Sequence, residues 1–365
     1  MKEVVLVVFG GKSVEHDISV ITAVQTMKNL PEQYNFLPLY IDKSGQWWIA
    51  DNLQDVSVFK NFAKSSKNKK KVAIMQKTLL VEKGKKYVPK FKIKAVLNCC
   101  HGAVGENGAL QGIFETFDVA CTSCGVTSSA LCMDKAFMKD ILNANNILSA
   151  EYAYFDIQTY DKEGLPKNLE FPVIVKPANL GSSIGISVCK NHEEYDMALE
   201  LAFKFDKKVL VEKLVENLRE FNCACFSYGK EVFVSSVNEV KSKSDIYTFE
   251  EKYLSSESKN INAEKSLSKK IKVLTERVYK LFDCQGVVRV DFLYDNKAKA
   301  LYVNEINTIP GSLSTYLFKD VSAKELLSSI LQQAIKNFNE KQNLISNFDS
   351  KAIEIFEQFK PTSKK

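Results

Sequence analysis

Four polar side chains in the last third of the chain have the types and spacing to hold a divalent metal ion and a phosphate. They are Arg289, Asp291, Glu305 and Asn307, in the segment VVRVDFLYDNKAKALYVNEINTIPG. Two apolar runs flank a polar turn there, which predicts a β-hairpin. Side chains alternate across a strand, so Arg289 shares a face with Asp291, and Glu305 with Asn307. Carboxylate and amide oxygens suit Mg²⁺, and a guanidinium suits developing negative charge; the alternative is a sheet with a solvated charged face.

A second candidate site is the segment FPVIVKPANLGSSIGISVCK. It predicts a strand ending at Lys176, a glycine- and serine-rich loop, and a further strand. Backbone N–H groups and hydroxyls of Gly181, Ser182 and Ser183 can surround a triphosphate, with Lys176 as a point charge beside it. The loop lacks the G-x-x-x-x-G-K-[ST] pattern of a P-loop. An ordinary hairpin with a flexible tip is the alternative.

The N-terminal segment predicts a buried strand over Val4–Phe9, a Gly10-Gly11 turn and a helix that begins near Glu15. A helix N-terminus favours anions, but a carboxylate at this entrance competes with a bound phosphate. We therefore interpret Glu15 as an acceptor for a substrate ammonium group. Helix capping by an acidic residue is the alternative.

Another glycine-rich loop, HGAVGENGALQG, follows the apolar strand Ala95–Cys100 and carries His101 and Glu106. Loops at the carboxyl ends of parallel strands are the usual ligand sites of α/β folds. The neighbouring cysteines raise the alternative of a zinc cluster built from Cys99, Cys100, His101, Cys121 and Cys124. A single C-x-x-C pair without a second pair makes buried thiols the preferred interpretation.

Composition limits the class of protein. The 365 residues are 45% hydrophobic, with a net charge of +6 and nine cysteines, which is typical of a globular protein with reduced thiols. No apolar run reaches the length of a membrane span and no signal-peptide pattern is present, so we expect a cytoplasmic protein without a membrane partner. Basic runs such as KSSKNKKK lack interleaved aromatic residues, so we expect solvated loops and not nucleic-acid binding.

The order of predicted elements indicates an α/β fold of three units. We expect an N-terminal doubly wound, Rossmann-like sheet over 1–127, a central unit over 128–215, a C-terminal unit over 216–345 and a tail over 346–365. The stretch SSALCMDKAFMKDIL predicts one amphipathic helix that carries Lys135. The polar segment 245–262, which contains Lys252 and Tyr253, is predicted to be a lid.

Taken in order, these motifs resemble the D-alanine–D-alanine ligases of the ATP-grasp superfamily. The resemblance rests on GGKSVEHDIS, HGAVGENGALQG, MDKAFMK, VIVKPANLGSSIGIS, VLVEKLV, EEKYL, VRVDF and NEINTIPG, which span roughly positions 4 to 317. It implies a two-subdomain ATP-grasp fold after the N-terminal sheet. It also implies ATP and two Mg²⁺ ions, with Mn²⁺ as a possible substitute, an acyl-phosphate intermediate, D-alanine as substrate and a homodimer.

The resemblance also implies roles for individual residues. Glu15 binds the ammonium of the first D-alanine, together with Ser182 and Tyr253, and His101 lies near that substrate. Arg289 and the Gly311 amide stabilise the oxyanion. The metal ligands are Asp291, Glu305 and Asn307. The nucleotide ligands are Lys135, Lys176, Ser182, Ser183, Glu212, Lys213, Val215, Glu220 and Lys252.

Three departures from the family pattern affect these expectations. In PGSLSTYLF, Tyr316 followed by Leu317 stands where a small hydroxyl side chain helps to hold the second substrate's carboxylate. The loop reads GENG where GEDG is commoner, and the spacing from Glu212 to Glu220 is one residue longer. The alternatives are therefore a ligase for another acceptor, such as D-lactate or D-serine, or for a different amino acid pair. A nucleotide-binding regulator without turnover would lack part of the metal-binding set, which is complete here.

Overall fold

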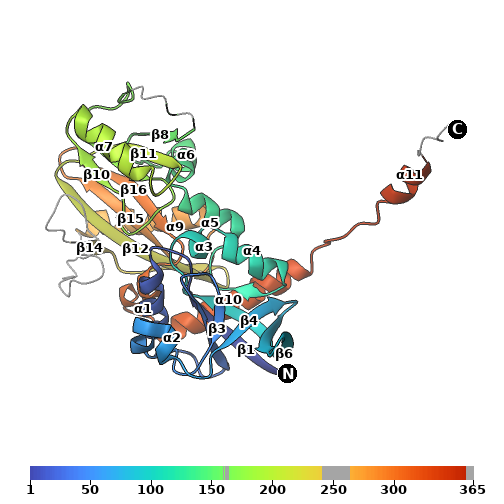
Figure 1. The fold of residues 1–365 in the computed structure, drawn as a ribbon. Coiled ribbons are helices and arrows are strands. Elements are labelled where there is room, and N and C mark those ends of the chain that lie inside the picture. The colour runs from blue at the N-terminus through green and yellow to red at the C-terminus, as the bar shows by residue number, and fades with distance from the viewer. Residues whose placement is uncertain (159, 161–163, 241–263, 359–365) are drawn as a thin grey trace.

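The computed structural model describes residues 1–158, 160, 164–240 and 264–358, which form three β-sheets covered by helices (Figure 1). The predicted lid over 245–262, with Lys252 and Tyr253, lies outside the described residues. Within the described residues, no helix is long and apolar enough to cross a membrane.

The first sheet combines a parallel half and an antiparallel half. β1 pairs in parallel with β2 and β6, and β6 with β7, which is the arrangement expected of a doubly wound unit. The antiparallel strands β3, β4 and β5 connect β2 to β6, and the basic run KSSKNKKK lies between β3 and β4, ending in the first residues of β4. The strands are β1 Lys2–Gly10, β2 Phe36–Ile41, β3 Trp47–Ile49, β4 Lys70–Met75, β5 Thr78–Lys83, β6 Lys86–Asn98 and β7 Ala120–Cys121.

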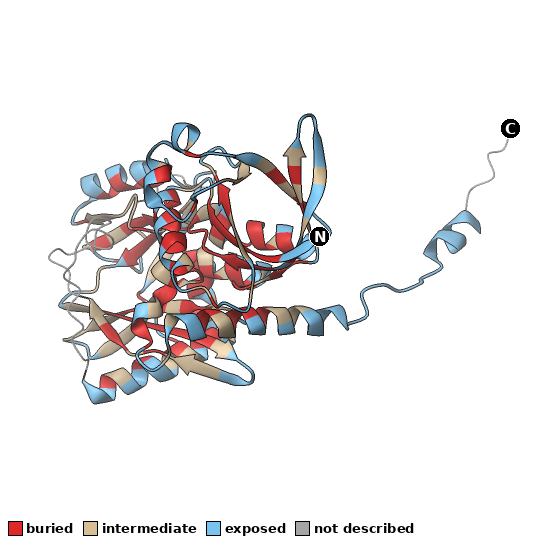
Figure 2. Ribbon diagram, turned by 90° about the horizontal axis from the view of Figure 1, so that it is seen from below, coloured by how far each residue is buried: buried red, intermediate tan, exposed pale blue. Residues whose placement is uncertain are grey.

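Helices and short 3₁₀ segments connect and cover this sheet. The first elements are α1 His16–Met27, η1 Val56–Asn61, α2 Phe62–Ser65, α3 Ala103–Glu106 and α4 Ala109–Thr116. Residues from α10 (Ala323–Gln342) complete the same core, which also includes Phe226. α10 therefore packs against the sheet formed by the N-terminal part of the chain, and Figure 2 shows the buried residues gathered between these layers.

The single helix predicted over SSALCMDKAFMKDIL is wrong, because two helices form there: α5 Val126–Met133 and α6 Lys135–Ala144. Asp134 lies between them with extended backbone angles, and its carboxylate accepts hydrogen bonds from Ala136 N and Phe137 N. An aspartate in this position caps a new helix more favourably than it continues the old one.

The second sheet is antiparallel, in the order β10-β9-β11-β8, and α7 His192–Ala202 packs on it. Its strands are β8 Tyr152–Asp156, β9 Val173–Pro177, β10 Ser187–Cys189 and β11 Lys208–Lys213. The two strands predicted on either side of the Gly-Ser loop are confirmed, and they pair with each other in antiparallel register, with Val175 opposite Ser187.

The third sheet is also antiparallel, in the order β13-β12-β15-β16 with β14 beside β12. Its strands are β12 Leu218–Tyr228, β13 Glu231–Val234, β14 Asn238–Val240, β15 Val288–Asp295 and β16 Ala300–Asn307. Its core includes α9 Lys265–Leu281 together with Cys132, Met138 and Leu142 of α5 and α6. The 3₁₀ segment η2 Gly311–Leu317 then leads to α10.

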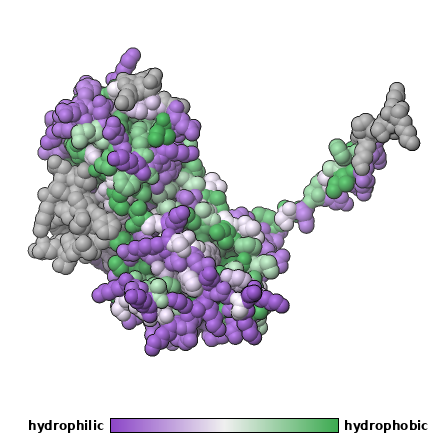
Figure 3. All heavy atoms as spheres, viewed as in Figure 1, coloured by the Kyte–Doolittle hydropathy of each residue, from purple (hydrophilic) through white to green (hydrophobic). Residues whose placement is uncertain are grey.

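Beyond α10 the chain extends away from the body to α11 Ala352–Gln358 (Figure 1). Ile353 and Phe356 of this short helix are exposed. Figure 3 shows apolar residues along the same segment.

Candidate functional site

The hairpin predicted around the expected metal ligands is confirmed, since β15 and β16 pair in antiparallel register. Arg289 lies opposite Asn307, and Asp291 lies opposite Glu305. Directly opposed side chains in such a pair lie on one face of the sheet, within contact distance. The structure therefore brings all four predicted residues to one surface.

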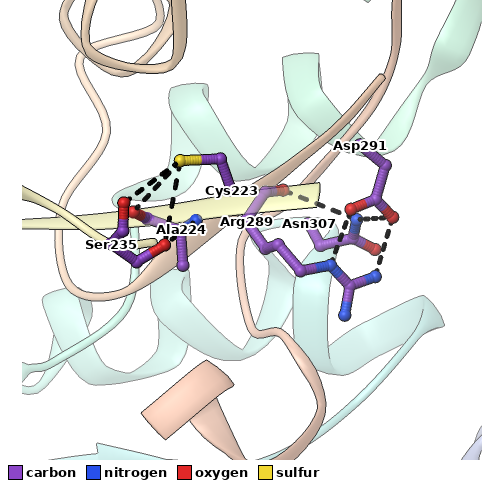
Figure 4. Close-up of polar contacts among 6 residues, drawn as sticks. All are labelled: Cys223, Ala224, Ser235, Arg289, Asp291 and Asn307. Carbon is purple, nitrogen blue, oxygen red and sulfur yellow. Dashed lines mark hydrogen bonds and ion pairs between the residues drawn. The ribbon is translucent and has the colours of Figure 1, made fainter. Parts of the chain in front are cut away.

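Asp291 is the centre of a charged hydrogen-bond network on this surface (Figure 4). Arg289 donates from Nε to Asp291 Oδ1 at 2.6 Å and from Nη2 to Oδ2 at 2.7 Å. Asn307 Nδ2 donates to Asp291 Oδ2 at 3.0 Å. This two-pronged pairing balances the carboxylate charge. Arg289, expected to bind the substrate, thus also orients a predicted metal ligand.

A pocket lies between the second and third sheets. Its walls come from β9, β11 and the Gly-Ser loop on one side and from β12, β15 and β16 on the other. It collects most of the residues predicted to bind the nucleotide, and it also reaches a predicted metal ligand. These lining residues are Lys135, Lys176, Ser183, Glu212, Lys213, Val215, Glu220 and Glu305.

The buried carboxylate of Glu212, in the wall of the pocket, pairs with two lysine ammonium groups. Lys176 Nζ lies 2.7 Å from Glu212 Oε2, and Lys139 Nζ lies 2.8 Å from Glu212 Oε1. Burial opposes ionisation of Glu212, but the two ammonium groups prevail and lower its pKa to about 2. Lys135 Nζ donates to Leu180 O of the Gly-Ser loop at 2.7 Å. Glu212 is thus a charged partner of lysines as well as part of the pocket wall.

Lys139 is a residue that the sequence analysis missed. Its side chain is fully buried, and burial lowers its pKa. The signal was present in the sequence, because Lys139 follows Lys135 by four residues and so lies on the same helix face.

Glu15 joins the first sheet to the Gly-Ser loop. Ser182 Oγ donates a hydrogen bond to Glu15 Oε1, and a Cβ atom at Gly181 would lie 2.9 Å from Glu15 Oε2. Glu15 occupies the N-cap position of α1 but makes no side-chain capping hydrogen bond there. The buried Glu15 carboxylate faces the backbone of Gly181, which can approach closely because glycine has no side chain.

His101 lies in a hydrogen-bond chain that reaches η2. His101 Nε2 is 2.8 Å from Thr22 Oγ1, which accepts the backbone N–H of Ser312 at 3.0 Å. Burial, followed by repulsion from Arg289, lowers the pKa of His101 to about 4, so the ring is neutral at pH 7. Thr22 had no distinctive motif in the sequence.

The residues predicted for the second substrate differ in exposure. Gly311 begins η2 directly after the hairpin, and Tyr316 is more than half exposed. The Leu317 side chain is buried in the core shared by α1 and α10. Gly311 therefore lies shortly after the end of the β15–β16 hairpin, whereas the Leu317 side chain is directed into the core.

Glu106 connects the loop after β6 to the turn after β16. It accepts the backbone N–H of Gly102 at 2.7 Å and that of Ile309 at 3.1 Å. Burial and the nearby Glu15 carboxylate raise its pKa to about 8. It thus links the two segments that carry His101 and Gly311.

The zinc-cluster alternative is not supported. All nine cysteines are free thiols, and burial raises the pKa of Cys99 to about 12. Across 1–158, 160, 164–240 and 264–358, no group of three His, Cys, Asp or Glu residues is arranged to hold a metal ion.

Family models and individual relatives that match this chain all describe the same kind of protein. Residues 4–124 match the family model described as D-ala D-ala ligase N-terminus, and residues 141–333 match D-ala D-ala ligase C-terminus. The D-alanine--D-alanine ligase of Thermosipho melanesiensis is 37% identical, over 95% of this chain and 97% of that protein. The counterpart from Caldicellulosiruptor bescii is 34% identical, over 93% and 97%.

Solved structures agree in fold. The D-alanine-D-alanine ligase of Helicobacter pylori superposes with a TM-score of 0.75 at 26% identity, covering 91% of this chain and 98% of that one. The VanG D-Ala:D-Ser ligase of Enterococcus faecalis gives 0.78 at 29% identity, covering 92% and 100%.

Proposed function

The chain belongs to the D-alanine–D-alanine ligase family of ATP-dependent ligases, and we propose that the pocket between its second and third sheets binds ATP for the joining of two D-alanines. The observation that carries this proposal is the composition of that pocket, which is lined by Lys135 and Lys176 together with Glu305, a predicted metal ligand. The product, D-alanyl-D-alanine, serves peptidoglycan precursor synthesis.

In this proposal, Lys135, Lys176 and the backbone around Ser183 bind the phosphates of ATP. Lys213, Val215 and Glu220 line the part of the pocket that receives the adenosine. Lys252, a further expected phosphate ligand, belongs to the segment outside the described residues.

The residues of the β15–β16 hairpin suit Mg²⁺. Asp291, Glu305 and Asn307 supply hard oxygen atoms on one surface, and the pairing of Asp291 with Arg289 shows that this surface already accepts positive charge. Two Mg²⁺ ions held there, or Mn²⁺ in their place, would neutralise the triphosphate charge. Arg289 orients Asp291 and faces the charge that develops during the reaction.

Glu15 and Ser182 bind the ammonium of the first D-alanine, with Tyr253 expected to join them from the undescribed segment. Neutral His101 lies near this substrate without adding a positive charge. One oxygen of the substrate carboxylate attacks the γ-phosphorus and ADP leaves, which gives an acyl phosphate.

The amine of the second D-alanine then attacks the acyl carbon, and inorganic phosphate leaves as the amine loses a proton. Arg289 and the Gly311 amide stabilise the oxyanion of the tetrahedral intermediate. Tyr316 is the proposed contact for the carboxylate of the second substrate, with Leu317 contributing through its backbone because its side chain is buried. We also propose that the enzyme is cytoplasmic, where ATP is supplied, and that it is a homodimer.

The test is phosphate release from ATP and Mg²⁺ with D-alanine alone, followed by D-alanine with D-lactate, D-serine or L-amino acids, with products identified by mass. We expect D-alanyl-D-alanine as the main product. Glu305→Gln should abolish turnover, whereas Glu276→Gln, which removes an exposed carboxylate paired with Lys280, should not. Full activity in Glu305→Gln would overturn the metal assignment. Phosphate release only with another acceptor would change the substrate and retain the ATP site.

A further inference from the structure

Lys139 is the most deeply buried ammonium group among the described residues that has no part in the reaction outlined above. Its side chain has no solvent exposure, and its Nζ lies 2.8 Å from Glu212 Oε1. It does not line the pocket in the described part of the chain, whereas Glu212 and Lys176 both do. Lys139 therefore reaches the pocket only through another residue.

The position of Lys139 follows from helix and strand geometry. α6 places Lys135 and Lys139 one turn apart, so both extend toward the second sheet. On that sheet Tyr152 of β8 lies directly opposite Glu212 of β11. Lys139 Nζ is 5.4 Å from the centre of the Tyr152 ring. The ammonium is thus held by a carboxylate and an aromatic face.

The charges around Glu212 do not balance one to one. One carboxylate is shared by two lysines, each within 2.8 Å. A buried carboxylate with no counter-ion is strongly unfavourable. If Lys176 turns toward a phosphate, Glu212 therefore needs another positive charge, and Lys139 supplies it.

We propose that Lys139 is a positioning residue for the nucleotide: it neutralises Glu212 so that Lys176 is available to bind phosphate. This inference rests on the proposed ATP site. Without Lys139, Lys176 would be the remaining ion-pair partner of Glu212 among the described residues, and ATP would have to compete for that lysine. The effect should appear in ATP affinity and not in the KM for D-alanine.

The test is calorimetric titration of the full chain with ATP and Mg²⁺. We expect Lys139→Met to raise the Kd for ATP about tenfold and to leave the KM for D-alanine unchanged. The matched control is Lys208→Met. Lys208 lies on the same strand as Glu212, and the change removes its partly buried ion pair with Asp134, at 2.7 Å. Neither Lys208 nor Asp134 lines the pocket in the described part of the chain. The control should change the Kd by less than about twofold.

A second pair of variants covers the case in which Lys139→Met does not fold. Once Glu212→Gln has removed the carboxylate, removing Lys139 as well should change the Kd by less than about twofold. In the double variant neither partner remains as an unpaired buried charge, so it should fold. In Glu212→Gln alone, the buried Lys139 side chain can lose its proton, since burial already lowers its pKa.

An unchanged ATP affinity in folded Lys139→Met would overturn the inference. A double variant that binds ATP about tenfold more weakly than Glu212→Gln alone would also overturn it, because Lys139 would then act directly on the nucleotide. Failure of the unaltered protein to bind ATP would instead refute the proposed ATP site, and the first titration reveals this before any variant is compared.

Discussion

Gly286 lies at the junction between the first and third sheets and leaves no room for a side chain. It has a φ of +66°, and a Cβ atom built there would overlap the carbonyl oxygen of Thr122 and lie 2.9 Å from the Thr122 carbonyl carbon. These are backbone atoms next to β7, so they cannot rotate away as a side chain can. Gly286 O also accepts a hydrogen bond from Tyr279 at 3.0 Å. We predict that Gly286→Ala strongly destabilises the protein.

The expected loss in the free energy of unfolding has two parts, a backbone part and a packing part. A non-glycine residue in the left-handed region costs roughly 1–2 kcal/mol. Overpacking against a fixed backbone typically adds about 1–3 kcal/mol. Gly229 provides the matched control, because it has the same φ of +66° but no atom within 4 Å of its would-be Cβ among the described residues. Gly229→Ala should therefore show only the backbone part.

The assay is thermal and urea unfolding of both variants beside the unaltered protein. We expect Gly286→Ala to be less stable than Gly229→Ala by about 2 kcal/mol, which for a chain of this length corresponds to a Tm lower by roughly 2–3 °C. Equal stability of the two variants would refute the argument that the β7–β15 junction is rigid and closely packed.

Three further predictions concern the candidate site. Glu15→Gln should raise the KM for the first D-alanine by roughly tenfold or more, because a hydrogen bond to a charged group contributes about 1.5–3 kcal/mol. The affinity for ATP, measured by calorimetric titration, should stay the same. Tyr316→Phe should raise the KM for the acceptor D-alanine in steady-state kinetics by a similar factor, about tenfold. His101→Gln should flatten the pH dependence of stability between about pH 4 and 6.5 in urea unfolding.

The sign of the His101 effect follows from its lowered pKa. Between about pH 4 and 6.5 the unfolded chain binds a proton at this ring and the folded protein does not, so stability falls as pH decreases. The full contribution is about 3 kcal/mol. A pH profile identical in His101→Gln and the unaltered protein would refute the burial argument. Unchanged KM values would likewise refute the assignments of Glu15 and Tyr316.

The sequence by itself determined the strands of the candidate site. Alternating and continuous apolar runs predicted the β15–β16 hairpin and the strands around the Gly-Ser loop, because strand periodicity is a local property. The same alternation placed Asp291 and Glu305 on surfaces that could meet. The resemblance to the ligase family directed attention to Lys135, Lys176 and Glu212, which the structure brings into one pocket.

Only the tertiary structure decided which charges balance one another. Lys139 and Glu212 are 73 positions apart by their residue numbers, and Glu106 meets Ile309 across 203 positions. Burial and electrostatic interactions depend on distances between side chains, which a single sequence does not specify. The break at Asp134 has a local and a long-range part. The helix cap competes locally with helix continuation, whereas the ion pair to Lys208 forms only in the folded chain.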